Sequence, residues 1–184
     1  TCTPSTDDIT INVDELPTTA DAGLDQTICS PTATLSANTP LIGTGTWTVI
    51  AGTGAVTSVN DPNSGVTGLT TGVNTFRWTI TNGTCTPSTD DITINVDELP
   101  TAADAGLDQT ICSPTATLSA NTPLIGTGTW TVIAGTATVT SVNDPNSGVT
   151  GLTTGVNTFR WTITNGTCTP STDDITINVD ELPT

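Results

Sequence analysis

A repeat of 83 residues constrains the fold of this chain more than any other feature of its sequence. Residues 19–101 and 102–184 align without gaps, and residues 1–18 match residues 84–101. The two full copies differ only by the small-residue swaps Thr19/Ala102, Gly54/Ala137 and Ala55/Thr138. Because the copies are so alike, we expect them to share one structure and one function. Residues 1–18 then form the last-strand fragment of a preceding repeat plus its linker, followed by domains at 19–101 and 102–184.

Each repeat contains a hairpin pattern that predicts its fold class. In residues 75–83, Phe76, Trp78 and Ile80 alternate with polar residues, and residues 91–96 alternate in the same way. Period-2 alternation is typical of strands with one face on a core. The rest of the repeat has short β-prone runs separated by Gly, Pro and Asn turns, and no run of helix formers. Residues 22–28 are expected to form a first, edge-type strand, and residues 8–13 the terminal strand of the preceding repeat. The sequence predicts tandem antiparallel β-sandwich domains, stacked end to end because the connectors are short.

The tryptophans of each repeat are predicted to supply most of its large core surface. Trp47 and Trp78 lie in runs that we expect to be neighbouring strands, each alternating with polar residues. Burial of each ring stabilises the fold by about 2–3 kcal/mol. The alternative is an exposed aromatic platform on which a sugar stacks, and the alternation favours the core.

The charge of the chain limits its partners. The net charge is −16, with two arginines, no lysine and no histidine. A polyanion of this kind does not bind nucleic acid or anionic membranes by counterion release. No apolar segment reaches the ~20 residues that cross a bilayer, so membrane insertion is not expected. The composition favours a solvated, self-repelling surface or the binding of divalent cations.

Several segments together resemble a known group of repeats. They are residues 22–27, residues 33–35, the Trp47 strand, and the hairpin with its Asn-Gly turn and its Asp-Ile-Thr-Ile-Asn-Val end. This order is similar to the PKD-like and Ig-like repeats of very large secreted Bacteroidota surface proteins, such as gliding-motility adhesins and other type IX-secreted repeat proteins. The resemblance covers nearly the whole chain. It departs from PKD proper at residues 45–49, where PKD domains usually carry Trp-Asp-Phe-Gly-Asp-Gly.

The resemblance implies a role and a place for this chain. It implies a structural repeat of a long extracellular adhesin or cell-surface filament, acting as a rigid, protease-resistant spacer or stalk. The implied partners are neighbouring repeats of the same chain and other copies in a filament. The family has no catalytic residues to carry over, and no nucleophile–base pair or phosphate loop occurs in the sequence. The alternative function is a carbohydrate-binding module that contacts surface glycans through loops 38–45 and 60–65.

The five cysteines are interpreted as disulfide cysteines, because no histidine or metal-type spacing accompanies them. Three pairings stay open. Pairing within a repeat joins Cys29 to Cys85 and Cys112 to Cys168, so that the partner of Cys2 lies outside this sequence. Pairing across the junction joins Cys2 to Cys29 and Cys85 to Cys112. Pairing between neighbouring repeats joins Cys29 to Cys168.

Acidic residues gather at both connectors, where their oxygens are candidate Ca²⁺ ligands. The candidates are Asp14, Glu15, Asp21, Asp25, Asp97, Glu98, Asp104 and Asp108. A solvated acidic linker explains the same residues and is the interpretation that we favour, so no cofactor is required. The adjacent Asp90 and Asp91 lack the spaced partner that acid–base chemistry needs. Asn82-Gly83-Thr84 matches a glycosylation sequon but is first a hairpin turn.

Overall fold

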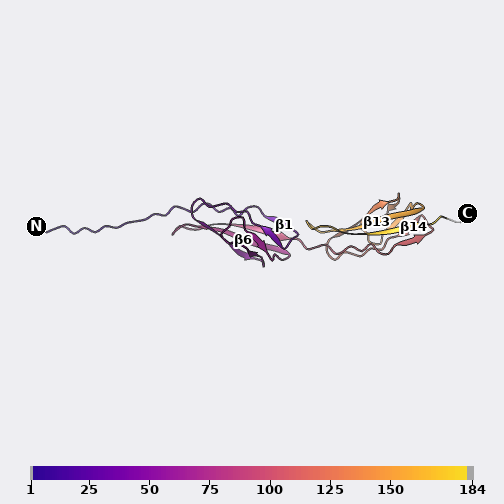
Figure 1. Cartoon of the computed structure of the whole chain (residues 1–184), viewed down its shortest axis with the longest axis horizontal. Coiled ribbons are helices and arrows are strands. Elements are labelled where there is room, and N and C mark those ends of the chain that lie inside the picture. The colour runs from indigo at the N-terminus through magenta and orange to yellow at the C-terminus, as the bar shows by residue number, and fades with distance from the viewer. Residues whose placement is uncertain (1, 182–184) are drawn as a thin grey trace. The chain divides into compact units, whose positions relative to one another are not determined.

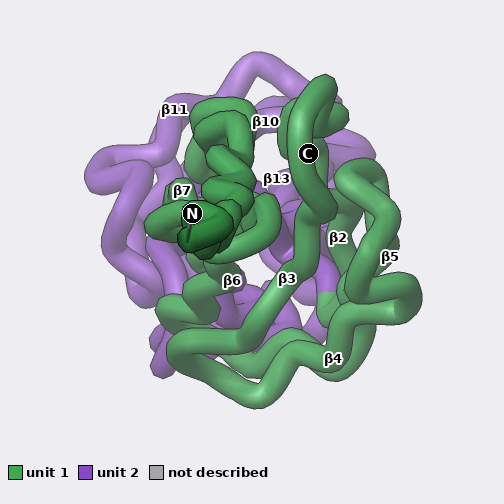
Figure 2. Tube along the Cα trace, turned by 90° about the vertical axis from the view of Figure 1, so that its left-hand side faces the viewer, with its two compact units in different colours: residues 1–26, 31–95 green, residues 27–30, 96–184 purple. Residues whose placement is uncertain are grey.

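The fold is all-β in the computed structural model, which describes residues 2–181. Residue 1 and residues 182–184, the outer ends of the expected segments 1–18 and 102–184, lie outside the described residues. Within the described part there is no helix with the length and apolar character to cross a membrane. The chain forms two compact units, residues 1–26 with 31–95 and residues 27–30 with 96–184 (Figure 2).

Seven strands form in each repeat of the described chain, and several of them are labelled in Figure 1. Those of the first repeat are β1 (Gln26–Ile28), β2 (Thr32–Thr34), β3 (Thr44–Ala51), β4 (Ala55–Val56), β5 (Gly65–Thr67), β6 (Gly72–Thr81) and β7 (Ser88–Val96). Those of the second are β8 (Gln109–Ile111), β9 (Thr115–Thr117), β10 (Thr127–Ala134), β11 (Thr138–Val139), β12 (Gly148–Thr150), β13 (Gly155–Thr164) and β14 (Ser171–Val179).

The strands of each repeat make two sheets. The first repeat has a four-stranded sheet in the order β1-β7-β6-β3 and a three-stranded sheet in the order β2-β5-β4. The second repeat has the matching sheets β10-β13-β14-β8 and β11-β12-β9. β3 pairs antiparallel with β6, as β10 does with β13 and β13 with β14, whereas β8 runs parallel to β14. The two sheets form a β-sandwich in each repeat, which confirms the predicted fold class.

A pair of tryptophans lies in the core of each sandwich, as predicted. Trp47 on β3 is directly opposite Trp78 on β6, and their ring centroids are 5.0 Å apart at an interplanar angle of 44°. Trp130 and Trp161 repeat this geometry on β10 and β13. All four rings are 98–100% buried. A tilted pair of this kind adds about 0.5–1.5 kcal/mol to the free energy of burial.

Gly45 makes room for the tryptophan pair. It precedes Trp47 by two residues on β3, so it lies on the same face of the sheet and opposite Ile80. A Cβ atom at this position would overlap the indole ring of Trp78. The equivalent Gly128 has the same relation to Trp161. The glycine is therefore needed for the close approach of the ring rather than for a special backbone angle.

Two segments that were expected to be strands differ in the structure. The expected strand at 22–28 is a strand only over Gln26–Ile28, because the backbone N–H of Ala22 donates to the Asp90 carboxylate instead of to a strand neighbour. Residues 8–13 form no strand, although the identical residues 91–96 lie in β7. Ile9, for example, is 86% exposed, whereas its equivalent Ile92 is fully buried. A strand needs a neighbour, and residues 8–13 have no strand neighbour among residues 2–181.

We predict that Gly45→Ala lowers the free energy of unfolding by about 2 kcal/mol, because the added methyl group forces the Trp78 ring out of its place in the core. Chemical denaturation followed by tryptophan fluorescence measures this change. Gly54→Ala is the matched control, since the second repeat already carries Ala137 at that position in its core. A loss from Gly54→Ala as large as that from Gly45→Ala would contradict the explanation.

Candidate functional site

The connector acids and a hairpin turn form one polar site in the first unit. The turn follows β6 and comprises residues 82–85. The backbone N–H and the hydroxyl of Thr84 donate to Asp14 Oδ2 at 2.9 and 3.1 Å. The side-chain amide of Asn82 donates to the carbonyl oxygen of Glu15 at 2.8 Å. The turn therefore binds the side chain of Asp14 and the backbone of Glu15, although the turn and the connector are about 70 residues apart in sequence.

These hydrogen bonds change the acidity of the connector. The backbone N–H of Thr84, followed by its hydroxyl, holds the pKa of Asp14 below its usual value, because both donors stabilise the charged carboxylate. Gly83 has a φ of +52°, which suits glycine, and a Cβ atom there would overlap the carboxylate of Asp14. The Asn-Gly pair is thus needed for the turn and for the close approach of the acid.

The second unit repeats the site. Thr167 donates to Asp97 Oδ2 from its N–H at 2.7 Å and from its hydroxyl at 2.9 Å. Asn165 donates to the carbonyl oxygen of Glu98 at 2.7 Å. The side-chain amide of the glycosylation sequon is engaged in this hydrogen bond, which agrees with its interpretation as a turn. We call each of these arrangements the turn–connector site: residues 82–85 with 14–15, and residues 165–168 with 97–98.

The structure contains a disulfide at the second turn–connector site. It joins Cys29 to Cys168, with a Cα–Cα distance of 4.9 Å and a sequence separation of 139 residues. Both cysteines belong to the second compact unit, which includes residues 27–30. Cys168 is 5% exposed, and its Sγ atom lies 3.3 Å from the carbonyl oxygen of Glu98. Of the three pairings that the sequence left open, this is the one between neighbouring repeats.

Three cysteines are free thiols in the structure: Cys2, Cys85 and Cys112. Cys85 ends the first turn, and its Sγ atom lies 3.2 Å from the carbonyl oxygen of Glu15. Cys112 follows β8 and is exposed, with its Sγ atom 3.7 Å from the carbonyl oxygen of Asp180. Cys2 is exposed in the N-terminal segment, which forms no strand. The two internal free thiols therefore lie against backbone carbonyls of a connector.

Four other candidate calcium ligands accept hydrogen bonds from backbone N–H groups. Asp21 Oδ1 and Asp104 Oδ1 each accept from the glycine N–H two residues later, at 2.9 Å. Asp25 Oδ1 and Asp108 Oδ1 each accept from a backbone N–H of the last strand, at 2.8 Å. Nowhere in residues 2–181 do three acidic, cysteine or histidine side chains gather as a metal site requires. Calcium binding at the connectors stays a prediction, and melting with and without a chelator tests it.

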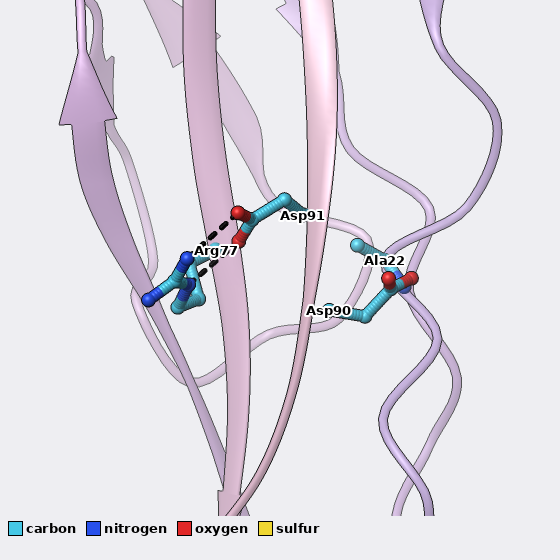
Figure 3. Close-up of polar contacts among 4 residues, drawn as sticks. All are labelled: Ala22, Arg77, Asp90 and Asp91. Atoms are coloured by element: carbon cyan, nitrogen blue, oxygen red, sulfur yellow. Dashed lines mark hydrogen bonds and ion pairs between the residues drawn. The ribbon is translucent and has the colours of Figure 1, made fainter.

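Arg77 and Asp91 form an ion pair across β6 and β7. The guanidinium donates two hydrogen bonds, at 2.7 and 2.8 Å, and the hydrogen bond holds the pKa of Asp91 below its usual value. Asp90 points to the other side of β7, where it accepts from the Ala22 N–H at 2.7 Å (Figure 3). Arg160 and Asp174 repeat the ion pair. The adjacent carboxylates thus have separate structural partners.

Comparisons with known proteins identify a fold and no family. No protein-family model matches the sequence, and no curated protein matches it. A solved structure of Sidekick-1 immunoglobulin domains 1–5 matches 91% of this chain with a TM-score of 0.55 at 12% identity. Domains 1–4 of the same protein match 94% of it with a TM-score of 0.53 at 14% identity. The chain spans 40% and 51% of those two structures.

A PKD domain from the KIAA 1837 protein is also similar, over 45% of this chain and 90% of that domain, at 24% identity and a TM-score of 0.39. At these identities the comparisons show the fold alone. The chain therefore consists of tandem immunoglobulin-like β-sandwich domains.

Sequence reasoning missed the turn–connector site, although it named most of its residues. Asn82 and Thr84 were assigned to a turn, and Asp14 to an acidic linker or a calcium site. In a near-perfect repeat every pair of residues recurs at a constant separation, so spacing alone does not show which pairs touch. The chemical signal is the Asn-Gly-Thr turn itself, which presents three donors to any nearby carboxylate or carbonyl group.

We predict three free thiols in the oxidised chain, because only the disulfide between Cys29 and Cys168 forms. Thiol titration under denaturing conditions measures the number, and either of the other pairings leaves one. Trypsin cuts the unfolded chain after Arg77 and Arg160, giving residues 1–77, 78–160 and 161–184. Without reductant, the first and third fragments should stay joined while the middle one is released. A middle fragment joined to either neighbour would overturn the pairing.

We also predict that the ion pairs contribute to stability only while their carboxylates are charged. The pKa of Asp91 and that of Asp174 are lowered in the folded state, so their contribution is present above the ordinary value of 3.8 and is lost as pH falls through the folded pKa. The difference in unfolding free energy between the wild type and the Asp91→Asn/Asp174→Asn variant should shrink below pH 3.8. Urea denaturation from pH 7 to 2 tests this, and a constant difference would refute it.

Proposed function

We propose that this chain is a structural repeat of a long extracellular adhesin or cell-surface filament, in which it acts as a protease-resistant spacer. One observation carries the proposal: many charged side chains of the repeat are engaged in hydrogen bonds or ion pairs within the chain itself. The connector acids accept from backbone N–H groups, Arg77 pairs with Asp91, and a disulfide closes a long loop. Side chains engaged in this way contribute to the structure of the domain rather than to a reaction.

The position of the protease sites supports this role. Arg77 and Arg160 are the only tryptic sites in the sequence. Each lies within the long strand of its sheet, β6 or β13, which has a strand neighbour on both sides. A protease needs its substrate as an extended, unpaired segment, so cleavage at these sites requires that the sheet open first.

The buried aromatic residues argue against the alternative of a carbohydrate-binding module. All six aromatic side chains of the sequence are at most 2% exposed. A sugar ring stacks on an exposed aromatic face, and the surface of this chain offers none. Glycan contacts would then rest on polar loops alone, at 38–45 or 60–65. The buried rings therefore favour the spacer over the glycan binder.

The chemistry of the chain also supports an extracellular location. A disulfide that closes a loop of 139 residues persists in an oxidising compartment and is reduced in the cytosol. The net charge of −16 gives a self-repelling surface that keeps a long array soluble. The proposed partners are further copies of the same repeat.

We predict that trypsin cleaves the native chain at least about a thousandfold more slowly than the chain unfolded in urea, because cleavage follows the small unfolded population. Gel analysis of a digestion time course measures both rates. The matched control is Ile11→Arg, which places a tryptic site in the exposed strandless segment, and this variant should be cut there rapidly while the rest stays intact.

A second measurement separates the spacer from the glycan binder. A glycan array probed with the fluorescent two-repeat chain should show no bound sugar above background. Specific binding that is lost on substitution within residues 38–45 or 60–65 would replace the spacer role with carbohydrate recognition. Rapid tryptic cleavage of the native wild type would remove the mechanical part of the proposal.

A further inference from the structure

The first turn–connector site has all the parts of the second except one. In both sites the turn threonine donates twice to an aspartate, and the turn asparagine donates once to the next carbonyl oxygen. The cysteine that ends the turn lies 3.2 Å from a connector carbonyl at Cys85 and 3.3 Å from one at Cys168. Only Cys168 has a disulfide partner. The residues around Cys85 therefore already have the arrangement of the complete site, without the second cysteine. We call this arrangement a half-site.

Cys112 forms the complementary half. At the complete site, the N–H of Asp97 donates to the carbonyl oxygen of Ile28, which places the connector beside Cys29. Around Cys112, the N–H of Asp180 donates to the carbonyl oxygen of Ile111 at 2.8 Å, so residues 180–181, the equivalents of 97–98, occupy the matching position. The Cys112 Sγ atom lies 3.7 and 3.9 Å from the carbonyl oxygens of Asp180 and Glu181.

A pocket adjoins this second half-site within the same unit. It has a volume of about 500 Å³, and its lining includes Cys112, Pro114, Leu152 and Val179. Its lining also includes Asp180 and Glu181, the equivalents of the two residues that the second turn holds. An incoming Asn-Gly-Thr-Cys turn has both its hydrogen-bond acceptors and its thiol partner at this place.

We propose that Cys85 and Cys112 are the two halves of the disulfide site that is complete at Cys29 and Cys168, and that a further copy of the 83-residue repeat supplies the missing half of each. The first cysteine of every repeat is then bonded to the second cysteine of the next repeat. The complete site in the same molecule, built by the same residues, is the observation that carries this assignment. This inference rests on the proposed spacer function, because it applies to a chain in which repeats follow one another. It adds to that function a covalent bond between neighbouring repeats.

Each bond forms by thiol–disulfide exchange with a small-molecule disulfide such as oxidised glutathione. One cysteine thiolate attacks glutathione disulfide and releases one reduced glutathione. The second thiolate attacks the mixed disulfide and releases another. The two protein thiols are thereby oxidised, the glutathione disulfide is reduced to two thiols, and the two protons pass to the released thiolates. Cys85 and Cys112 are both accessible for this reaction, since Cys112 is exposed and Cys85 is half-buried.

The test lengthens the chain by one repeat at its end. A second copy of residues 102–184 is fused after residue 184, giving seven cysteines, and the protein is refolded in a glutathione redox buffer. The proposal predicts two disulfides and three free thiols. One free thiol would mean pairing within repeats or across the junction, and five would mean that Cys112 finds no partner. Either number would overturn the proposal.

Trypsin identifies the new bond in the lengthened chain. Without reductant, the fragment 78–160 should now be joined to the last fragment, which has the same sequence as residues 161–184. In the unextended chain the fragment 78–160 is released with two free thiols, so this chain is the matched control. Cys112→Ser should abolish the new bond and raise the free thiols from three to four. Cys2→Ser should leave both bonds in place.

A chain lengthened at its N-terminal end tests the partner of Cys85 independently. It also tests the proposal if the chain lengthened at its C-terminal end fails to fold. Residues 1–18 repeat residues 84–101, so a copy of residues 19–83 placed before Thr1 completes a preceding repeat. This chain has six cysteines, and the proposal predicts two free thiols with Cys85 bonded to the added cysteine. Four free thiols, none, or a bond from Cys85 to Cys112 would overturn it. The numbers of free thiols in the two lengthened chains do not depend on glycan binding or on the rate of proteolysis. Failure of the disulfide proposal is therefore distinguishable from failure of the spacer function.

Discussion

The cross-strand tryptophan pair is the interaction on which the rest of each sandwich depends. Trp47 and Trp78 meet at a centroid distance of 5.0 Å, and Gly45 leaves the space that the second ring fills. A repeat of 83 residues is close to the lower limit for a self-sufficient core, so two large rings supply burial that many small side chains here do not. The pairing also sets the register of β3 on β6, because a slip of one strand by one residue would turn its tryptophan to the opposite face of the sheet.

The acidic composition has a structural explanation in this fold. Asp14, Asp25 and Asp90 each accept a hydrogen bond from a backbone N–H group distant in sequence. Short strands leave many backbone donors without a strand neighbour, and a carboxylate satisfies such a donor without a further strand. The acids therefore replace part of the hydrogen bonding that longer sheets would provide. The same arrangement keeps the surface charged and solvated.

Three features act together in the turn–connector site: a glycine turn, hydrogen bonds and a cysteine. A left-handed glycine lets the carboxylate of the connector approach, and the threonine donates to that carboxylate. The asparagine donates to the next backbone carbonyl oxygen, and at Cys168 the cysteine adds a covalent bond. A disulfide across a long loop stabilises mainly by restricting the unfolded chain, with a typical contribution of about 2–4 kcal/mol. The hydrogen bonds place the thiol before it is oxidised. The turn positions the thiol and the cysteine supplies the covalent bond, which explains why the turn sequence and the cysteine occur together in every repeat.

Much of the fold could be predicted from the sequence, because it depends on local patterns. Alternation at Phe76, Trp78 and Ile80 identified the central strand and its buried face, and the 83-residue period identified the tandem arrangement. Strand ends were less predictable: residues 8–13 have the sequence of β7 and form no strand, since strand formation requires a neighbour. The local sequence sets the preference for a strand, and the presence of a neighbouring strand decides whether the strand forms.

The cysteine pairing shows the limit most clearly. The sequence by itself determined that the core is aromatic and that each repeat is a small β-domain. It predicted disulfides but did not show that Cys85 and Cys112 are free in this chain. Only the tertiary structure decided that Cys29 bonds to Cys168, because a disulfide requires Cα atoms within about 7 Å and residues 139 apart are brought that close by folding alone. It likewise decided that the acidic connector is bound by a hairpin turn, a contact between segments whose separation in sequence carries no information about their distance in space.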